Sequence, residues 1–216
     1  MSLYKLLHSS IGEKILMAFT GFFLMIFLFV HLCVNLSLFF GEKAFNSAAL
    51  FMESNPFVQI SQYMLAFFFI LHIFLGILLH LKNIKARGNV NYTYTKWDAH
   101  TPFNARTMIF SGILILLFLI LHLKNFTIPL KNDKYGKINN YQLVISLFKN
   151  PVYTFIYILS FVILSLHLSH GFQSSFRSVG IFQKSYISTI KKIGFIYFWL
   201  ISIGFSSIAL WFFFRT

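Results

Sequence analysis

The sequence predicts an all-α integral membrane protein, a bundle of five transmembrane helices that forms a single membrane domain over residues 1–216. Of the 216 residues, 57% are hydrophobic and only 11% are charged, whereas a soluble domain carries about 25% charged residues. The apolar residues are also collected into five long runs. One bundle accounts for this length without a second domain.

Each apolar run is long enough to cross a hydrocarbon layer of about 30 Å, because a helix rises about 1.5 Å per residue. The expected spans are residues 15–40, 57–81, 107–127, 152–173 and 193–214. The first span is too long for a signal peptide and lacks a small-residue cleavage site, so we expect it to be retained as a helix.

The breaks between the spans contain residues that start helices. Residues 54–56 (Ser-Asn-Pro) and 149–151 (Lys-Asn-Pro) place Asn near the cap and Pro in the first turn of the second and fourth spans. Residues 101–104 (Thr-Pro-Phe-Asn) do the same before the third span. The segment 124–149 is expected to be a polar loop, since it contains several Asn, Asp and Gly turn formers.

The net charge of +13 comes from 18 Lys and Arg against five Asp and Glu. These cations lie almost entirely between the apolar runs, where they fix the topology and contact lipid headgroups. Nucleic-acid binding is not expected, because no basic stripe alternates with exposed aromatic residues. The segments on the same side of the membrane as the N-terminus hold eleven of the Lys and Arg residues and those on the other side hold seven, which predicts a cytoplasmic N-terminus.

The cysteine and glycine patterns exclude several cofactors. Cys33 is the single cysteine, so the chain has no internal disulfide, no covalently attached c-type haem and no cysteine cluster for iron and sulfur. It also lacks a glycine-rich phosphate loop. Nucleotide or flavin chemistry would therefore have to lie on another chain.

The histidines are the most informative residues. Six of the eight lie within the expected spans or at their ends: His31, His72, His80, His122, His167 and His170. An imidazole in hydrocarbon is costly unless it faces the bundle interior and has a partner there. A single such histidine is usually a packing residue, but here the first four spans each contribute one.

These four spans place their histidines at two depths. His31 and His122 lie about 24 Å and about 22 Å above the starts of the outward-running first and third spans. His72 lies about 14 Å from the inner end of the second span, and His167 lies at a similar depth in the fourth. We therefore expect one pair near the outer side and one nearer the inner side.

Two histidine pairs at two depths suit two b-type haems, since an iron with two axial imidazoles takes one histidine from each of two facing helices. Gly76 and Gly171 each follow an inner histidine by four residues, on the same helix face, where they leave room for a flat macrocycle. Close helix packing explains either glycine equally well when it is taken singly. Their recurrence after both inner histidines favours the haem interpretation.

Small and polar residues share the helix faces of the histidines, at helical spacing. They are Thr20 and Asn35 in the first span, Ser111 and Asn125 in the third, and Ser160 and Ser174 in the fourth. Such side chains either orient ligands or form hydrogen bonds between helices, and spacing alone does not distinguish the two roles.

Further polar residues lie near the expected inner ends. His80 shares a face with the ligand candidate of the second span and competes with it, and His170 lies one turn from the candidate in the fourth. If they are not ligands, these two histidines would extend to the membrane–water interface, or would contact a haem propionate or a quinone. Arg106 and Arg177 would either pair with a haem propionate or act only as inner-side cations that fix the orientation of the helices in the membrane.

The pattern of five spans with histidines in the first four is accompanied by His72-x-x-x-Gly76, Arg106-Thr-Met, His122-Leu and, most specifically, residues 167–180 (HLSHGFQSSFRSVG). Together these features resemble the cytochrome b membrane-anchor subunit of succinate:quinone oxidoreductases, that is, succinate dehydrogenase or fumarate reductase. The similarity is to the single-subunit, five-helix, two-haem kind of menaquinone-using bacteria, and it extends over nearly the whole chain.

The resemblance implies two haem b groups and their ligands. His72 and His167 would bind the inner haem, and His31 and His122 the outer one. The glycines that follow favour His72 and His167 over the other histidines of those spans.

The resemblance also implies partners and a location. A flavoprotein and an iron–sulfur subunit would dock on the cytoplasmic side and carry out the succinate–fumarate chemistry, so this chain would not act on succinate by itself. A quinone, menaquinone by the same resemblance, would be the exchangeable substrate, with the direction of electron transfer left open. The chain would be a multi-pass protein of the bacterial cytoplasmic membrane.

Some members of this family have acidic residues inside the bundle that are tied to proton uptake and quinone chemistry. The acidic residues of this chain all lie outside the expected spans: Glu13, Glu42, Glu53, Asp98 and Asp133. Ser165 stands where one such Glu lies in the family. Proton coupling by that route is therefore not expected.

Two other functions fit parts of the pattern. The chain could be the cytochrome b subunit of another respiratory complex, of the nitrate reductase or hydrogenase type, but one histidine on each of four helices favours the succinate family. A transporter without haem could use the histidines as a proton relay, but the spans lack the acidic residues that such a relay employs.

Overall fold

The computed structural model describes residues 9–87, 107–133, 138–181, 183 and 185–215. In these residues all regular structure is helical and no strand occurs. Five helical segments are long and apolar enough to cross a membrane: Ser10–Phe40, Pro56–Ala86, Met108–Asn132, Pro151–Ser178 and Ile187–Phe214. The predicted all-α class with five membrane helices is confirmed.

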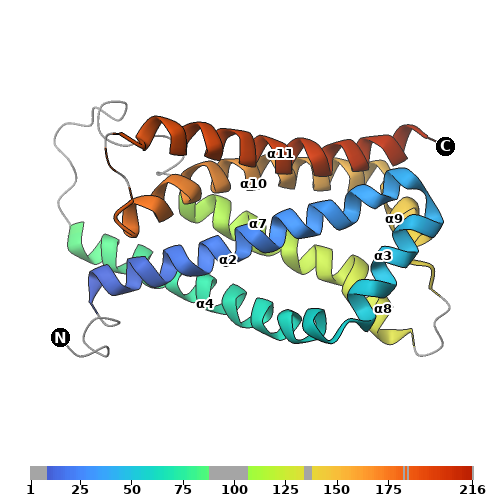
Figure 1. The fold of residues 1–216 in the computed structure, drawn as a ribbon, viewed down its shortest axis with the longest axis horizontal. Coiled ribbons are helices and arrows are strands. Elements are labelled where there is room, and N and C mark those ends of the chain that lie inside the picture. The colour runs from blue at the N-terminus through green and yellow to red at the C-terminus, as the bar shows by residue number, and fades with distance from the viewer. Residues whose placement is uncertain (1–8, 88–106, 134–137, 182, 184, 216) are drawn as a thin grey trace.

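The first membrane segment consists of α2 (Ser10–Leu36) and the 3-10 turn η1 (Ser37–Phe40), and the second is α4 (Pro56–Arg87). The third consists of α7 (Met108–His122), the π-helical turn η2 (Leu123–Thr127) and α8 (Ile128–Asn132). The fourth is α10 (Pro151–Ser178) and the fifth is α11 (Ile187–Phe214). Successive membrane helices run in opposite directions (Figure 1). The start of α2 and the end of α11 therefore lie at opposite ends of the bundle.

Two further helices, α3 (Glu42–Ser54) and α9 (Asn140–Phe148), cap one end of the bundle and pack against each other. The expectation of a polar loop over 124–149 is wrong for α9 and for the helical continuation of α7. Val144 and Phe148 of α9 are buried, and the Asn139 side chain accepts a hydrogen bond from the backbone of Gln142. Polar residues at and around the ends of this short helix made its apolar face difficult to recognise in the sequence.

The helix starts at residues 54–56 and 149–151 are confirmed. Asn55 Oδ1 accepts a hydrogen bond from the Phe57 amide at 2.9 Å. Asn150 Oδ1 accepts one from the Val152 amide at 3.0 Å. The start expected at residues 101–104 lies outside the described residues.

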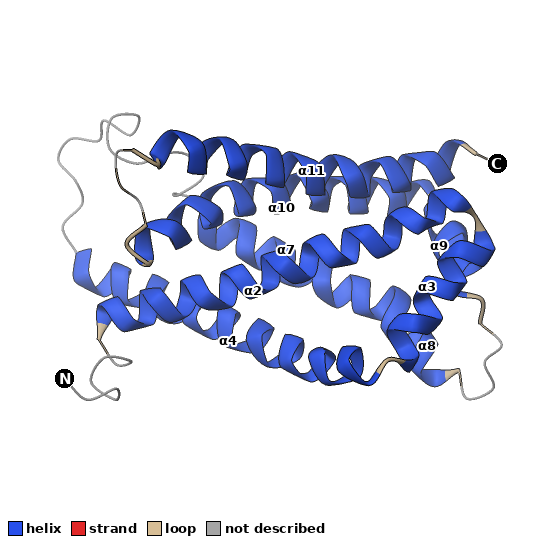
Figure 2. Cartoon of the chain, viewed as in Figure 1, coloured by secondary structure: helices blue, strands red, loops and turns tan. Residues whose placement is uncertain are grey.

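Four of the membrane helices form a ring. Helix α2 packs against α4 and α10, and α7 packs against the same two helices. Helix α11 lies outside the ring along α10 and α2, and the turns among the described residues lie at the ends of the bundle (Figure 2). Consequently α2 faces α7 diagonally across the ring, and α4 faces α10.

The distribution of apolar side chains is that of a membrane protein. Leu32, Tyr157 and Ile201 fill the interior, each with 1% of its surface exposed. Large apolar side chains such as Phe67 and Ile196 point outward and are 60% and 66% exposed. An apolar exterior around helices whose backbone hydrogen bonds are satisfied is stable in lipid rather than in water. This is therefore a multi-pass membrane protein in contact with lipid.

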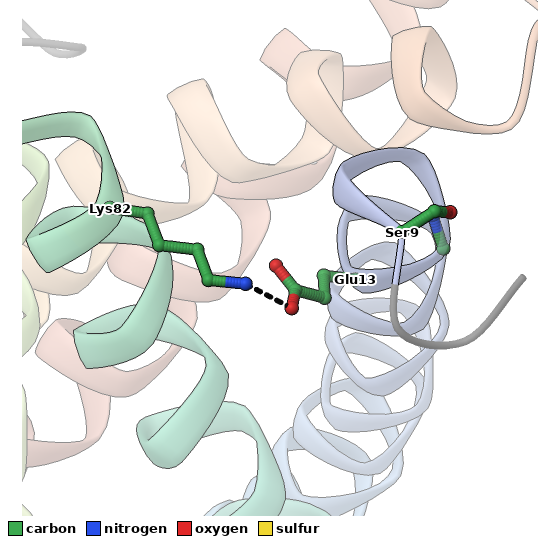
Figure 3. A network of polar contacts seen from close by, with 4 residues as sticks. Ser9, Glu13 and Lys82 are labelled. Carbon is green, nitrogen blue, oxygen red and sulfur yellow. Dashed lines mark hydrogen bonds and ion pairs between the residues drawn. The ribbon is translucent and has the colours of Figure 1, made fainter. Parts of the chain in front are cut away.

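An ion pair joins α2 to α4 near the start of α2 (Figure 3). Lys82 Nζ donates to Glu13 Oε1. Glu13 is only 8% exposed, and its Oε2 has no hydrogen-bond partner in the described part of the chain. The sequence places Glu13 outside the apolar runs, but α2 begins at Ser10 and carries this carboxylate into the contact with α4.

Replacing Lys82 with Met should destabilise the bundle by about 1–3 kcal/mol, because the buried Glu13 carboxylate loses its charged donor. The double variant Glu13→Gln/Lys82→Met should recover much of this loss, since no charge remains buried. Thermal unfolding of the detergent-solubilised protein, followed by circular dichroism, measures both effects. Lys85→Met, at an exposed position of the same helix, is the control. Equal losses in the single and double variants would show that the two charges are not coupled.

Candidate functional site

The structure brings four intramembrane histidines together as two pairs. His31 on α2 and His122 on α7 have ring centroids 5.9 Å apart, with ring planes at 88°. His72 on α4 and His167 on α10 have ring centroids 6.5 Å apart, with ring planes at 67°. Each pair joins helices that are diagonal in the ring, and the pairs are those that helix depth predicts.

The spacing within each pair suits a metal held between two imidazoles. Two metal–nitrogen bonds of about 2.0 Å each, with about 1.2 Å from nitrogen to ring centre, place the centroids about 6.4 Å apart. Within the described ranges, no group of three or more His, Cys, Asp or Glu side chains could hold a metal ion. A metal between either pair would therefore take its other ligands from a cofactor, as the iron of a haem does.

The His72–His167 pair lies nearer to the start of α2 and is called the inner pair, and the His31–His122 pair is called the outer pair. Each histidine of the inner pair is held by a hydroxyl group of a neighbouring helix. Thr20 Oγ1 on α2 lies 3.1 Å from His72 Nδ1, and Ser111 Oγ on α7 lies 3.1 Å from His167 Nδ1. Thr20 is fully buried and Ser111 is 8% exposed. Because Nδ1 is occupied in both rings, Nε2 is the nitrogen left to bind a ligand.

The glycines nearest to the inner rings are Gly21 and Gly112, which directly follow the two hydroxyl residues in sequence. A methyl group at Gly21 would lie 3.7 Å from His72 Cε1, and one at Gly112 would lie 3.6 Å from His167 Cε1. A methyl group at either position would make an ordinary van der Waals contact, so α2 and α7 lie directly beside the imidazoles at these residues. The sequence analysis missed both as site residues.

Gly76 and Gly171, which the sequence analysis assigns to the haem faces, contact methionines instead. A methyl group at Gly76 would lie 3.6 Å from Met17 Cε, and one at Gly171 would lie 3.8 Å from Met108 Cε. Methionine side chains therefore lie, at ordinary van der Waals distance, where the haem interpretation places a macrocycle. Room for a macrocycle at these positions would require the two flexible methionine side chains to move.

A sequence repeat underlies this arrangement. Met-x-x-Thr-Gly at 17–21 and Met-x-x-Ser-Gly at 108–112 are each followed, after nine residues, by a histidine of the outer pair. Helices α2 and α4 thus supply the same elements as α7 and α10: a methionine, a hydroxyl, a glycine, an outer histidine and an inner histidine. Each histidine pair takes one member from each half. This repeat was the signal in the sequence that could have identified Gly21 and Gly112.

The outer pair has a more aromatic environment. Phe27 stacks on His31 with ring centroids 5.4 Å apart, and Tyr157 lies 6.1 Å from His122. His122 Nδ1 is buried and has no hydrogen-bond partner in the described chain. His31 Nδ1 lies 3.5 Å from the Asn35 amide nitrogen, which donates to the His31 carbonyl at 2.8 Å.

The other predicted site residues lie outside the two pairs. His80 on α4 and His170 on α10 are half-buried, and neither makes a ring contact with another histidine in the part of the chain described. Arg177 is exposed near the end of α10. Arg106 lies outside the described residues.

Comparisons of this chain with protein-family models, with curated proteins and with solved structures found no match.

Gly112→Ala should leave stability nearly unchanged, because its methyl group would make an ordinary contact with His167. Gly112→Leu should cost about 1–3 kcal/mol, because the added carbons must displace that imidazole or move α7 away from it. Thermal unfolding in detergent measures both variants. Ile113→Leu, at a 49% exposed neighbouring position, is the control. Equal stability of the Leu and Ala variants would show that a larger side chain at position 112 finds free space and does not displace His167.

Proposed function

We propose that this chain is a two-haem cytochrome b that anchors a succinate dehydrogenase or fumarate reductase in the membrane. It would pass electrons between the iron–sulfur subunit of the complex and a quinone. The observation that carries the proposal is the pairing of His31 with His122 and of His72 with His167, at spacings that suit one metal between two imidazoles.

A bound haem would supply one-electron redox chemistry, with its potential set by the axial ligands and the buried surroundings. The four histidines would provide those ligands, and Thr20 would orient one of the inner rings. Apolar side chains of the bundle would exclude water from both levels. His31 lies about 16 Å further along α2 than Thr20, which marks the inner level. Two such levels would span much of the hydrocarbon layer.

The distribution of ligands supports the succinate family over other respiratory cytochromes. Each of the four ring helices contributes one histidine, whereas the nitrate reductase and hydrogenase types are expected to distribute theirs differently. Residues 167–180 support the same family by their sequence. A flavoprotein and an iron–sulfur subunit would dock at the end of the bundle where α2 begins. That end would face the cytoplasm of a bacterium, and the quinone would be menaquinone.

The purified chain should contain two haems b. His72→Ala and His167→Ala should each remove the inner haem and keep the outer one, because each removes one of the two histidines that would hold it. His31→Ala and His122→Ala should do the reverse. Reduced-minus-oxidised spectra and the haem-to-polypeptide ratio measure the outcome.

His80→Ala and His170→Ala are the matched controls for this experiment and should retain both haems. Retention of both haems in His72→Ala or His167→Ala would instead make one of these two residues the inner ligand. A wild-type spectrum without b-type bands would exclude the haem and favour the histidine relay of a transporter.

Mild purification of the chain from its native membranes should co-isolate a flavin-containing subunit and an iron–sulfur subunit. The complex should reduce a menaquinone analogue with succinate, or oxidise its quinol with fumarate. A molybdenum- or nickel-containing partner would exclude the succinate family and assign the chain to a nitrate reductase or hydrogenase.

A further inference from the structure

We propose that Thr20 and Ser111 are positioning residues that hold His72 and His167 in one tautomer, with the proton on Nδ1 and the lone pair on Nε2. Each inner imidazole would then present a ligating nitrogen before any cofactor arrives. The inference depends on the proposed function only for the identity of the group that Nε2 binds.

Each hydroxyl has a single proton and two neighbours that could receive it. Thr20 Oγ1 lies 2.9 Å from the Met17 carbonyl oxygen and 3.1 Å from His72 Nδ1. A hydroxyl has one proton, and a carbonyl oxygen can only accept. If the proton goes to the carbonyl, the hydroxyl oxygen must accept from Nδ1–H, and Nε2 is left unprotonated.

The other half of the bundle repeats this arrangement. Ser111 Oγ lies 2.9 Å from the Met108 carbonyl oxygen and 3.1 Å from His167 Nδ1. The carbonyl belongs in both cases to the residue three positions before the hydroxyl, and both hydroxyls are buried, so water does not compete for their lone pairs. Two independent helices thus hold two histidines of one pair in the same way.

The outer pair differs from the inner pair in its contacts at Nδ1. His122 Nδ1 has no hydrogen-bond partner in the described chain, and His31 Nδ1 faces the amide nitrogen of Asn35 at 3.5 Å. Neither outer ring has a hydroxyl at Nδ1 that would direct its lone pair to Nε2. The inner level is therefore the one that the chain prepares in advance, because a hydrogen bond to the non-ligating ring nitrogen fixes both the tautomer and the orientation of a ligating histidine.

The tautomers can be measured without haem. The full chain, labelled with ¹⁵N-histidine and produced without haem, is placed in lipid nanodiscs, and its nitrogen chemical shifts are recorded. His72 and His167 should show a protonated Nδ1 and an unprotonated Nε2. Thr20→Val should convert His72 largely to the opposite tautomer and leave His167 unchanged, and Ser111→Ala should do the converse.

The conservative variants Thr20→Ser and Ser111→Thr should keep the wild-type tautomers, which a loss of packing alone would not explain. Ser202→Ala is the matched control, because the Ser202 hydroxyl is buried and donates to the Phe161 carbonyl, away from the histidines. A protonated Nε2 in the wild-type inner rings would overturn the proposal. So would unchanged tautomers in both hydroxyl-free variants.

The loaded protein provides the second readout. Thr20→Val should lower haem retention at the inner level by about 10- to 100-fold on dilution into haem-free detergent. In the fraction that keeps its haem, the inner midpoint potential should rise, since a less basic axial imidazole stabilises the oxidised iron less. The outer haem is the internal control and should be unaffected.

The two readouts separate this inference from the proposed function. The expected tautomers in a chain that binds no haem would uphold the positioning role and exclude the cytochrome. Two bound haems, with retention and potential unchanged in Thr20→Val and Ser111→Ala, would uphold the cytochrome and exclude the positioning role.

Discussion

Hydrocarbon contains no hydrogen-bond partner, and this constraint governs the whole molecule. The backbone satisfies it by forming helices, so every regular element in the described ranges is helical. Several polar side chains satisfy it by facing inward and finding partners on neighbouring helices. Glu13 is paired with Lys82 at one end, and the inner histidines are paired with hydroxyls of adjacent helices. The candidate site is thus a direct result of where polar groups can exist in this bundle.

The ring of four helices has an internal symmetry that gives each histidine pair its position. Helices α2 and α4 form one half and α7 and α10 form the other, and each half supplies one imidazole to each level. Diagonal helices do not pack closely in such a ring, so the space between them is where two side chains can enclose a third group. Of the ring helices, α11 packs chiefly against α10 and α2, and it also contacts the short helix α9. Helices α4 and α7 are left largely facing lipid.

The two levels differ in chemistry although they share this symmetry. Hydroxyl groups hold the inner imidazoles through Nδ1. The outer imidazoles are surrounded mainly by aromatic rings, among them Phe27 and Tyr157. One-electron centres at the two levels would therefore differ in potential, because hydrogen bonding to an axial ligand and the polarity of its surroundings both set that potential.

The sequence by itself determined the five membrane helices, because length and hydropathy are local properties. It also determined the depth of each histidine, because depth follows from the number of residues along a helix. The match of His31 with His122 and of His72 with His167 could therefore be predicted. Their role as haem ligands stays a prediction.

Only the tertiary structure decided what packs against each histidine. It showed that Gly21 and Gly112 lie against the inner rings, that Met17 and Met108 lie against Gly76 and Gly171, and that Glu13 is buried. These facts depend on the rotation of each helix about its axis and on the identity of its neighbour. Hydropathy does not set either one when every helix is apolar on nearly all sides, so the packing of specific side chains in the ring had to decide them.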